Sequence, residues 1–286
     1  MTAASFSLPG APRFPPPSLP RGMGPGENEV IHLEVLRVQD ITESYQAENG
    51  EIAALDHISF SMEKGEFISI VGPSGCGKST LLSIIAGLLP PTSGSVLVGG
   101  REVRGVDPHI GYMLQKDNLL EWRTIWRNVL LGLEIRRQVN EFTTARARRL
   151  LESYGLWEFR EKYPSQLSGG MRQRAALIRT LATSPDILLL DEAFSALDYQ
   201  TRLSVTDDVY RILRREEITT IMVTHDIPES ISMGDRIMIL SQRPARIQEM
   251  LTVDFGPDRT PLSCREDPRF SYYFNHIWKE LKSDGA

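Results

Sequence analysis

Hydrophobic and polar residues alternate along several segments in the first third of the chain. Apolar side chains recur at about every second position in segments 30–42 and 53–62. This spacing predicts half-buried β-strands. Segment 65–72 is a compact, β-branched run that enters a glycine-rich loop, and 94–100 is a shorter run of the same kind. We expect a strand from each of them.

Further along, helical spacing of apolar residues alternates with strand-like runs. Residues 78–89 predict a helix that ends at Pro90. Further helical segments are 124–138, 141–156 and 171–183, and the further strand-like runs are 109–115, 186–192, 218–226 and 235–242. Strands that alternate with helices predict an α/β fold with a mostly parallel sheet. The helical block 116–179 is predicted to be an inserted α-helical subdomain.

The two ends of the chain differ from this middle. Residues 1–29 are rich in proline and glycine, which predicts a disordered leader; a ligand for a proline-recognition domain is the alternative. In the tail, 255–286, the aromatic spacing of 270–281 predicts one amphipathic helix that docks on the body. Residues 30–254 are therefore expected to form the main domain.

Composition narrows the class of protein. With 286 residues, 41% apolar and 24% charged, the chain can bury a substantial core. The net charge of −5 argues against general nucleic-acid binding, although it leaves a local basic patch possible in principle. Cys76 and Cys264 are too few for a disulfide framework, which favours a reducing compartment. Because no apolar run approaches the ~18 residues of a membrane span, work at a membrane requires a partner that crosses it.

A phosphate-binding loop is predicted between a strand and a helix. The string GPSGCGKST fits G-x-x-x-x-G-K-[ST], whose glycines let backbone N–H groups point at phosphate oxygens. Lys78 supplies a charge for the β- and γ-phosphates, and Ser79 a hydroxyl ligand for Mg²⁺. The alternative is a tight turn without a ligand. The residues assigned to nucleotide binding here are Gly72, Pro73, Ser74, Gly75, Cys76, Gly77, Lys78, Ser79 and Thr80.

Two carboxylates follow the apolar strand ILLL, where parallel sheets bind ligands. We expect Asp191 to hold Mg²⁺ and Glu192 to deprotonate the attacking water, although a solvated strand end is the alternative. His225 ends another apolar strand near the same edge, where it is placed to bind the γ-phosphate and orient the water; by itself, a histidine at such a position is usually structural. Gln115 lies at the end of a third strand, where it is placed to contact Mg²⁺ or water. By itself, this residue does not distinguish a functional from a structural role.

The string LSGGM opens a helix about a hundred residues after the phosphate loop. Ser168, Gly169 and Gly170 expose a second set of N–H donors at a positive helix end. The chain resembles the ATP-binding subunits of ABC transporters over about residues 33–241. The resemblance rests on five elements in this order along the chain: the phosphate loop, Gln115, LSGGM, ILLLDE with SALD, and His225.

The resemblance implies a fold, a dimer and further site residues. The implied fold is a RecA-like P-loop NTPase core with an antiparallel β subdomain and the helical insert. Two copies are expected to clamp each ATP between one copy's phosphate loop and the other's Ser168–Gly170. The resemblance also implies that Asp198 of SALD lies across this interface, and that Tyr45 stacks on adenine rather than being an ordinary strand tyrosine.

The resemblance further implies work at a membrane. Integral-membrane permease subunits would bind the helical insert at the cytoplasmic face, and an external solute-binding protein would act indirectly. Trp122 and Trp126 belong either to this docking groove or to the core. Segments 119–134 and 259–281 resemble the nitrate/sulfonate/taurine import group, but Glu121 stands where that group often has proline. Importers of pyrimidine precursors or riboflavin therefore stay open.

Competing functions remain beside this interpretation. A non-transport ABC ATPase acting on nucleic acid or ribosomes usually carries a long coiled coil or two cassettes, and the sequence predicts neither. A purely regulatory module that binds nucleotide without hydrolysis is disfavoured by Glu192 and His225. Export is the alternative to import. The sequence therefore predicts an enzyme, an ATPase coupled to transport with ATP and Mg²⁺ as cofactors.

Overall fold

The structure, a computed structural model, describes residues 34–47 and 50–283. Contacts divide the chain into the units Met1–Ile31 and His32–Ala286, and every described residue belongs to the second unit. The leader predicted for residues 1–29 therefore lies outside the described residues.

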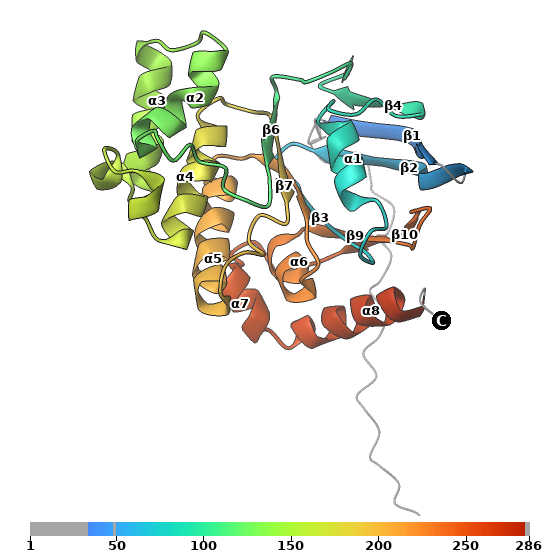
Figure 1. Cartoon of the computed structure of the whole chain (residues 1–286). Helices are drawn as coiled ribbons and strands as arrows, with labels where there is room; N and C mark the ends of the chain where they lie inside the picture. The colour runs from blue at the N-terminus through green and yellow to red at the C-terminus, as the bar shows by residue number, and fades with distance from the viewer. Residues whose placement is uncertain (1–33, 48–49, 284–286) are drawn as a thin grey trace, which may run out of the picture. The chain divides into compact units, whose positions relative to one another are not determined.

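A four-stranded antiparallel sheet forms the first layer of the described unit, in the order β2-β1-β4-β5 (Figure 1). Its strands are β1 (Glu34–Ala47), β2 (Gly50–Glu63), β4 (Ser93–Val98) and β5 (Arg101–Glu102). On β1, Leu36 and Val38 are buried while Arg37 and Gln39 are exposed. This alternation is the one that the sequence pattern predicts, and it gives the sheet one face for the core.

A six-stranded sheet forms the second layer, in the order β10-β9-β3-β8-β7-β6. Its strands are β3 (Phe67–Val71), β6 (Ile110–Met113), β7 (Ile187–Asp191), β8 (Thr219–Val223), β9 (Arg236–Leu240) and β10 (Ile247–Thr252). All neighbours pair in parallel except β10, which pairs antiparallel with β9. The predicted α/β class with a mostly parallel core and an antiparallel β part is confirmed.

Strand β7 is covered on both faces, which explains its uninterrupted run of apolar residues. Ile187 and Leu189 belong to the core between the two sheets, where helix α1 (Lys78–Ile85) also packs. Leu188 and Leu190 point the other way, into the core beneath the helical layer. Parallel strands buried on both faces require apolar side chains at consecutive positions, and β7 supplies them.

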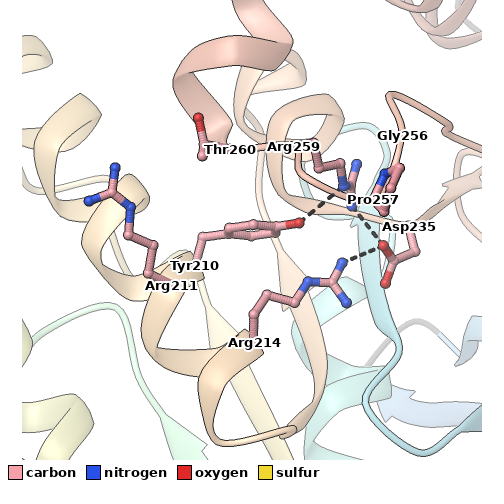
Figure 2. A pocket seen from close by; sticks show the side chains of 8 residues that line it. All are labelled: Tyr210, Arg211, Arg214, Asp235, Gly256, Pro257, Arg259 and Thr260. Carbon is pink, nitrogen blue, oxygen red and sulfur yellow. Dashed lines mark hydrogen bonds and ion pairs between the residues drawn. The ribbon is translucent and has the colours of Figure 1, made fainter.

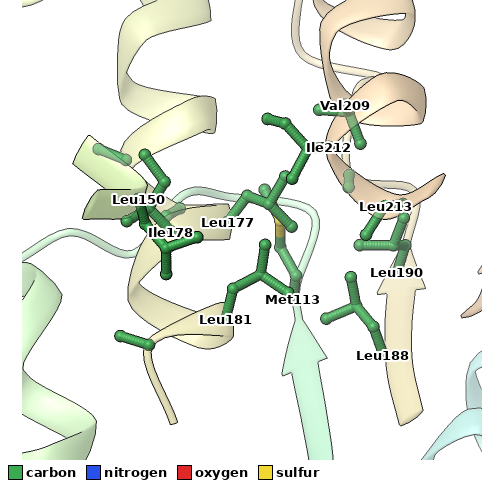
Figure 3. Packing of buried hydrophobic residues seen from close by; sticks show 14 of the residues in the cluster. Met113, Leu150, Leu177, Ile178, Leu181, Leu188, Leu190, Val209, Ile212 and Leu213 are labelled. Atoms are coloured by element: carbon green, nitrogen blue, oxygen red, sulfur yellow. The ribbon is translucent and has the colours of Figure 1, made fainter. Parts of the chain in front are cut away.

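The helical layer packs α4 between the sheet and its neighbouring helices. In Figure 3, Leu177 and Leu181 of α4 lie near Met113 of β6 and Leu188 of β7, and α5 side chains close the other side. The helices of this layer are α2 (Ile125–Ile135), α3 (Glu141–Ser153), α4 (Gly169–Leu181) and α5 (Tyr199–Arg215). The domain boundaries 30–254 and 116–179 stay predictions.

The two tryptophans of the insert have different environments. Trp122 is 75% exposed, whereas Trp126 packs partly buried against the helical-layer core. The Trp126 ring meets that of Trp157 edge-on, with centroids 5.7 Å apart. Trp126 is thus a core residue, and only Trp122 is available to a partner.

The tail folds into two helices where the sequence predicted one. Helix α7 (Pro261–Glu266) precedes α8 (Arg269–Ser283), and Thr260 caps α7 by accepting from the Ser263 N–H. Pro268 separates them, because proline cannot continue a helix. Ile277 of α8 is fully buried in a small core with α6 (Ile227–Met233) and β9.

An arginine pair ties the start of the tail to the body (Figure 2). Arg259 donates to Asp235 Oδ1 at 2.7 Å and to the Tyr210 hydroxyl at 3.1 Å, and Arg214 pairs with the same carboxylate. These residues line a cavity of about 480 Å³ at the N-terminal edge of β9. Asp235 accepts hydrogen bonds from both arginines, and these bonds attach the tail to the body. The cavity therefore lies at the point where the tail is attached.

Candidate functional site

The predicted catalytic residues meet at one edge of the parallel sheet. Strands β3, β7 and β8 run in the same direction and end at Val71, Asp191 and Val223. A cavity of about 540 Å³ opens at this edge. It is lined by Gly72, Ser74, Gly75, Gly77, Lys78, Ser79, Thr80, Glu192, His225 and Arg243. Parallel α/β sheets bind ligands in this position.

The phosphate loop requires glycine at two of its positions. Gly77 has φ +128, and a Cβ there would lie 2.8 Å from Leu55 Cδ2 and 3.0 Å from the Ala54 carbonyl oxygen. Gly75 also has a left-handed φ, +73. The loop runs directly into α1, whose first N–H groups have no side-chain cap. These free N–H groups and the helix dipole suit an anion.

Lys78 lies folded across the loop. Its Nζ donates to the Gly72 and Pro73 carbonyl oxygens, both at 2.8 Å, and the residue is only 7% exposed. Beneath it, Cys76 is buried in the core between the sheets. The Cys76 thiol therefore fills space in the core, and the Lys78 ammonium supplies the positive charge of the loop.

Asp191 and Ser79 form a pair of oxygen ligands. The Ser79 hydroxyl donates to Asp191 Oδ1 at 3.1 Å, and the Tyr112 hydroxyl donates to Oδ2, also at 3.1 Å. Burial raises the pKa of Asp191 above its usual value, while the donors from Tyr112 and Ser79 oppose the shift. Burial and the nearby carboxylate raise the pKa of Tyr112, so it keeps its proton and holds Asp191 in place.

Glu192 faces His225 across the cavity. Its Oε2 lies 3.2 Å from His225 Nδ1. Glu192 has φ +47, a left-handed conformation that is unusual for a residue with a Cβ. The strained backbone is held by the Glu192 N–H donating to Val223 O at 2.9 Å and by Ser195 Oγ donating to Glu192 O at 2.9 Å. Strained backbone of this kind clusters at active sites.

Tyr45 lies against the phosphate loop from the antiparallel sheet. Its hydroxyl donates to Thr80 Oγ1 at 3.2 Å, and the residue is 40% exposed. The ring is thus available beside the loop, in the region where an adenine-stacking residue is needed. Its stacking role stays a prediction.

Gln115 faces a second cavity of about 360 Å³. Its Nε2 donates to Ser195 Oγ at 3.0 Å, and it is not among the described residues that line the phosphate cavity. Gly169 and Leu197 line this second cavity as well. The structure therefore joins Gln115 to the SALD loop, and its contact with metal or water stays a prediction.

Ser168, Gly169, Gly170 and Asp198 lie outside the phosphate cavity. Ser168 caps α4 by accepting from the Met171 N–H at 3.4 Å, and it is exposed. Asp198 caps α5 by accepting from the Thr201 N–H at 3.1 Å, and this contact lowers the pKa of Asp198. Both helix starts thus present exposed caps, and neither contributes a residue to the lining of the phosphate cavity.

Three residues near this edge escaped the sequence analysis. Tyr112 holds Asp191, Arg243 lines the phosphate cavity, and Arg202 pairs with Asp226, the residue after His225. Tyr112 could have been found, because it precedes Gln115 on a strand beside ILLLDE. Nothing in the local pattern indicated Arg243 or Arg202.

The phosphate loop, the two carboxylates at the sheet edge and the fold define a P-loop ATPase. A family model described as "ABC transporter" matches residues 55–195. The "uncharacterized ABC transporter ATP-binding protein YtlC" of Bacillus subtilis (strain 168) is 48% identical over 88% of this chain and 97% of its own length. The chain belongs to the ABC transporter ATP-binding proteins; it binds ATP and is an ATPase.

Other relatives carry transport names. The "nitrate import ATP-binding protein NrtD" of Synechocystis sp. is 39% identical over 88% of this chain and 96% of its own length. The "taurine import ATP-binding protein TauB" of Jannaschia sp. is 36% identical over 82% of this chain and 90% of its own. Among solved structures, a dimeric post-hydrolysis ATP-binding cassette with ADP and Pi has a TM-score of 0.65 and 31% identity, covering 77% of this chain and all of that one.

Proposed function

We propose that the chain powers solute import across the cytoplasmic membrane as the ATPase subunit of a transporter. The names of NrtD and TauB support import, and they support a solute of the nitrate, sulfonate or taurine type. Glu121, where that group often has proline, keeps pyrimidine precursors and riboflavin in consideration. No helix in the described part is long and apolar enough to cross a membrane.

The nucleotide is sandwiched between two copies of the chain in this proposal. The observation that carries it is the separation of the two donor sets. Lys78 lines the phosphate cavity, whereas Ser168 caps an exposed helix start elsewhere and Gly169 lines a different cavity. A second copy in head-to-tail orientation supplies the missing donors, with Asp198 at the same interface. The dimeric form of the similar cassette supports this arrangement.

Hydrolysis uses the pair at the sheet edge. Glu192 accepts a proton from the attacking water, and His225, at 3.2 Å from it, orients the water and binds the γ-phosphate. Lys78 exchanges its bonds to the Gly72 and Pro73 carbonyls for phosphate oxygens. Gln115 senses the site through Ser195, whose hydroxyl also donates to the Glu192 carbonyl.

Mg²⁺ is the cofactor that these residues fit. Ser79 Oγ and Asp191 Oδ1 lie 3.1 Å apart, and hydroxyl and carboxylate oxygens are ligands that Mg²⁺ prefers. Mg²⁺ usually binds through few protein oxygens together with substrate phosphates and water. When bound, the ion neutralises charge on the phosphates, and Gln115 is the further ligand that we propose.

Integral-membrane permease subunits are the direct partners in this proposal, and an external solute-binding protein acts through them. The helical subdomain, about residues 116–179, carries large apolar side chains in contact with solvent. Trp122, Ile135 and Phe142 are each more than 70% exposed. Such exposure supports the docking of a permease helix at the cytoplasmic face of the membrane, where the chain is peripheral.

The test is the oligomeric state of Glu192→Gln with ATP and Mg²⁺. Slowed hydrolysis should trap a dimer, measured by light scattering after size-exclusion chromatography. Ser168→Arg is the companion variant, because a bulky side chain at the exposed helix start blocks the proposed interface without touching the phosphate cavity. A monomer with Glu192→Gln, or a dimer that survives Ser168→Arg, contradicts the sandwich.

The solute is tested separately in proteoliposomes. The chain is combined with a permease and a binding protein of the nitrate or taurine import type, and uptake of labelled nitrate, taurine and an alkanesulfonate is compared with that of a pyrimidine precursor and riboflavin. ATP-dependent uptake of one of the anions is the expected result. Uptake of pyrimidine precursor or riboflavin alone would redirect the solute assignment and leave the ATPase intact.

A further inference from the structure

Arg243 brings a second cation to the phosphate cavity. It stands in the turn between β9 and β10 and lines the cavity together with Lys78, Glu192 and His225. The residue belongs to none of the motifs that define the family resemblance. Its position in the cavity therefore needs its own explanation.

The turn that carries Arg243 is fixed to the neighbouring sheet. Ala245 is fully buried, and its N–H donates to the Ala54 carbonyl oxygen at 2.9 Å. The Asp56 N–H returns a bond to Ala245 O, also at 2.9 Å, and Arg246 Nε donates to the Asp56 carboxylate at 2.6 Å. Ala54 also packs against Gly77 of the phosphate loop. The turn and the loop thus share one rigid support.

The guanidinium of Arg243 contacts the phosphate loop with only some of its N–H donors. Its Nη2 donates to the Gly75 carbonyl oxygen at 2.7 Å, and this is its one hydrogen bond among the described residues. Lys78 differs, since its ammonium is buried and bonded to two carbonyl oxygens. Arg243 is exposed at the cavity mouth, so its remaining N–H groups are free to meet a ligand.

We propose that Arg243 binds the phosphate groups of the nucleotide. A guanidinium is always charged and presents parallel N–H donors that match phosphate oxygens. The bond to Gly75 fixes its position, and the anchored turn lowers the ordering cost on binding. Arg243 therefore adds affinity for the polyphosphate in each copy. This inference rests on the nucleotide site in the phosphate cavity.

Equilibrium binding of ATP and ADP to the full chain tests it, with Arg243→Gln and Arg243→Lys compared with the parent. Loss of a charge-assisted hydrogen bond predicts roughly 10- to 100-fold weaker binding for Arg243→Gln. The Lys variant retains the charge and should lose less. Arg104→Gln is the matched control: it removes an exposed arginine that pairs with Glu102 and does not line the phosphate cavity, so binding should stay within about twofold.

Ionic strength separates a phosphate contact from a merely structural clamp. A lost phosphate contact lowers the salt dependence of binding as well as the affinity, because one fewer charge pair forms. If Arg243→Gln binds like the parent, or binds weakly with the parent's salt dependence, Arg243 does not bind phosphate and the inference is overturned. If the parent itself binds no ATP, the nucleotide site fails, which is a different result. Thermal unfolding confirms that each variant is folded.

Discussion

Arg202 and Asp226 join the SALD loop to the loop of His225. Arg202 Nη1 lies 3.2 Å from Asp226 Oδ2, and Arg202 Nη2 donates to the Leu197 carbonyl oxygen at 2.9 Å. Both charged side chains are more than three-quarters buried. One guanidinium therefore connects the segment before Asp198, proposed to face the second copy, with the segment that carries the proposed γ-phosphate ligand.

We predict that Arg202→Ala lowers ATP turnover and spares ATP affinity. Removing the guanidinium leaves the Asp226 carboxylate without its partner and releases the backbone next to His225. A small displacement of a catalytic group costs roughly 10- to 100-fold in rate. ATP affinity should hold, because Arg202 does not line the phosphate cavity. Steady-state turnover and equilibrium ATP binding measure the two quantities.

Arg211→Ala is the control for this prediction. Arg211 lies on the same helix and pairs with Asp207 one turn away at 2.6 Å, with its side chain 65% exposed. Because the Arg211 guanidinium is mostly exposed, pairs within its own helix and does not line the phosphate cavity, its loss should leave turnover near the parent's. If both variants lose turnover equally, the loss comes from a general disturbance of helix α5 and not from the Arg202–Asp226 contact.

Glu229 predicts a pH dependence of stability. Burial, with help from Asp226, raises its pKa from 4.5 to about 7, against the opposing effects of the Thr224 hydroxyl, Arg202 and Arg265. Because the folded chain holds this proton more tightly than the unfolded chain, the stabilising contribution is full below about pH 4.5 and is lost as the pH rises to about 7.

Glu229→Gln removes this titration. Relative to the variant, the parent should lose up to about 3 kcal/mol of unfolding free energy as the pH rises from about 5 to 8. Melting temperatures of both proteins, measured across that range, give the comparison. The gap in melting temperature should widen with pH in favour of Glu229→Gln. A constant gap would mean that Glu229 titrates at its ordinary pKa.

The sequence predicted the main elements of the fold because their patterns are strong and local. The uninterrupted apolar run before Asp191 and the glycines before Lys78 each have one good structural solution. Strand β10 was not predicted, since its side chains are mostly partly buried and do not alternate. Helix α7 has only six residues, too few for a periodic pattern of apolar side chains. The capping residue Thr260 was the one local signal that could have predicted it.

Site residues that belong to a local sequence motif could be predicted. Site residues that reach the cavity only through the order of strands in the sheet could not. Lys78, Glu192 and His225 each end or follow a strand, so parallel pairing alone brings them to one edge. Arg243 reaches the same edge only because β9 lies beside β3 and its turn packs on Ala54. Such proximity depends on the order of strands in the sheet, which periodicity does not encode.

Gly170 is predicted to be required by packing as well as by any ligand. A Cβ at this position would lie 2.9 Å from Val205 Cγ2 and 3.3 Å from Thr201 Cγ2 on α5. Alanine favours a helix by up to about 1 kcal/mol over glycine, but overpacking of a core contact typically costs about 1–3 kcal/mol. Gly170→Ala should therefore lower the denaturation midpoint in urea.

Gly169→Ala is the neighbouring comparison for Gly170. Its Cβ would lie 3.2 Å from Leu197 Cδ2, the end of a side chain that can rotate away. The midpoint should change less than for Gly170→Ala. The packing explanation is wrong if Gly169→Ala is the more destabilised variant, or if Gly170→Ala matches the parent.

Tyr45 offers a test of the adenine side of the site. If the ring stacks on the base, Tyr45→Ala should weaken ATP binding roughly 5- to 100-fold, since base–aromatic stacking contributes about 1–3 kcal/mol. Tyr45→Phe keeps the ring and loses only the hydroxyl that donates to Thr80 at 3.2 Å. That variant should bind ATP nearly as well as the parent in fluorescence titrations. Equal weakening by Phe and Ala would show that the hydroxyl contact with the phosphate loop matters and that the ring does not.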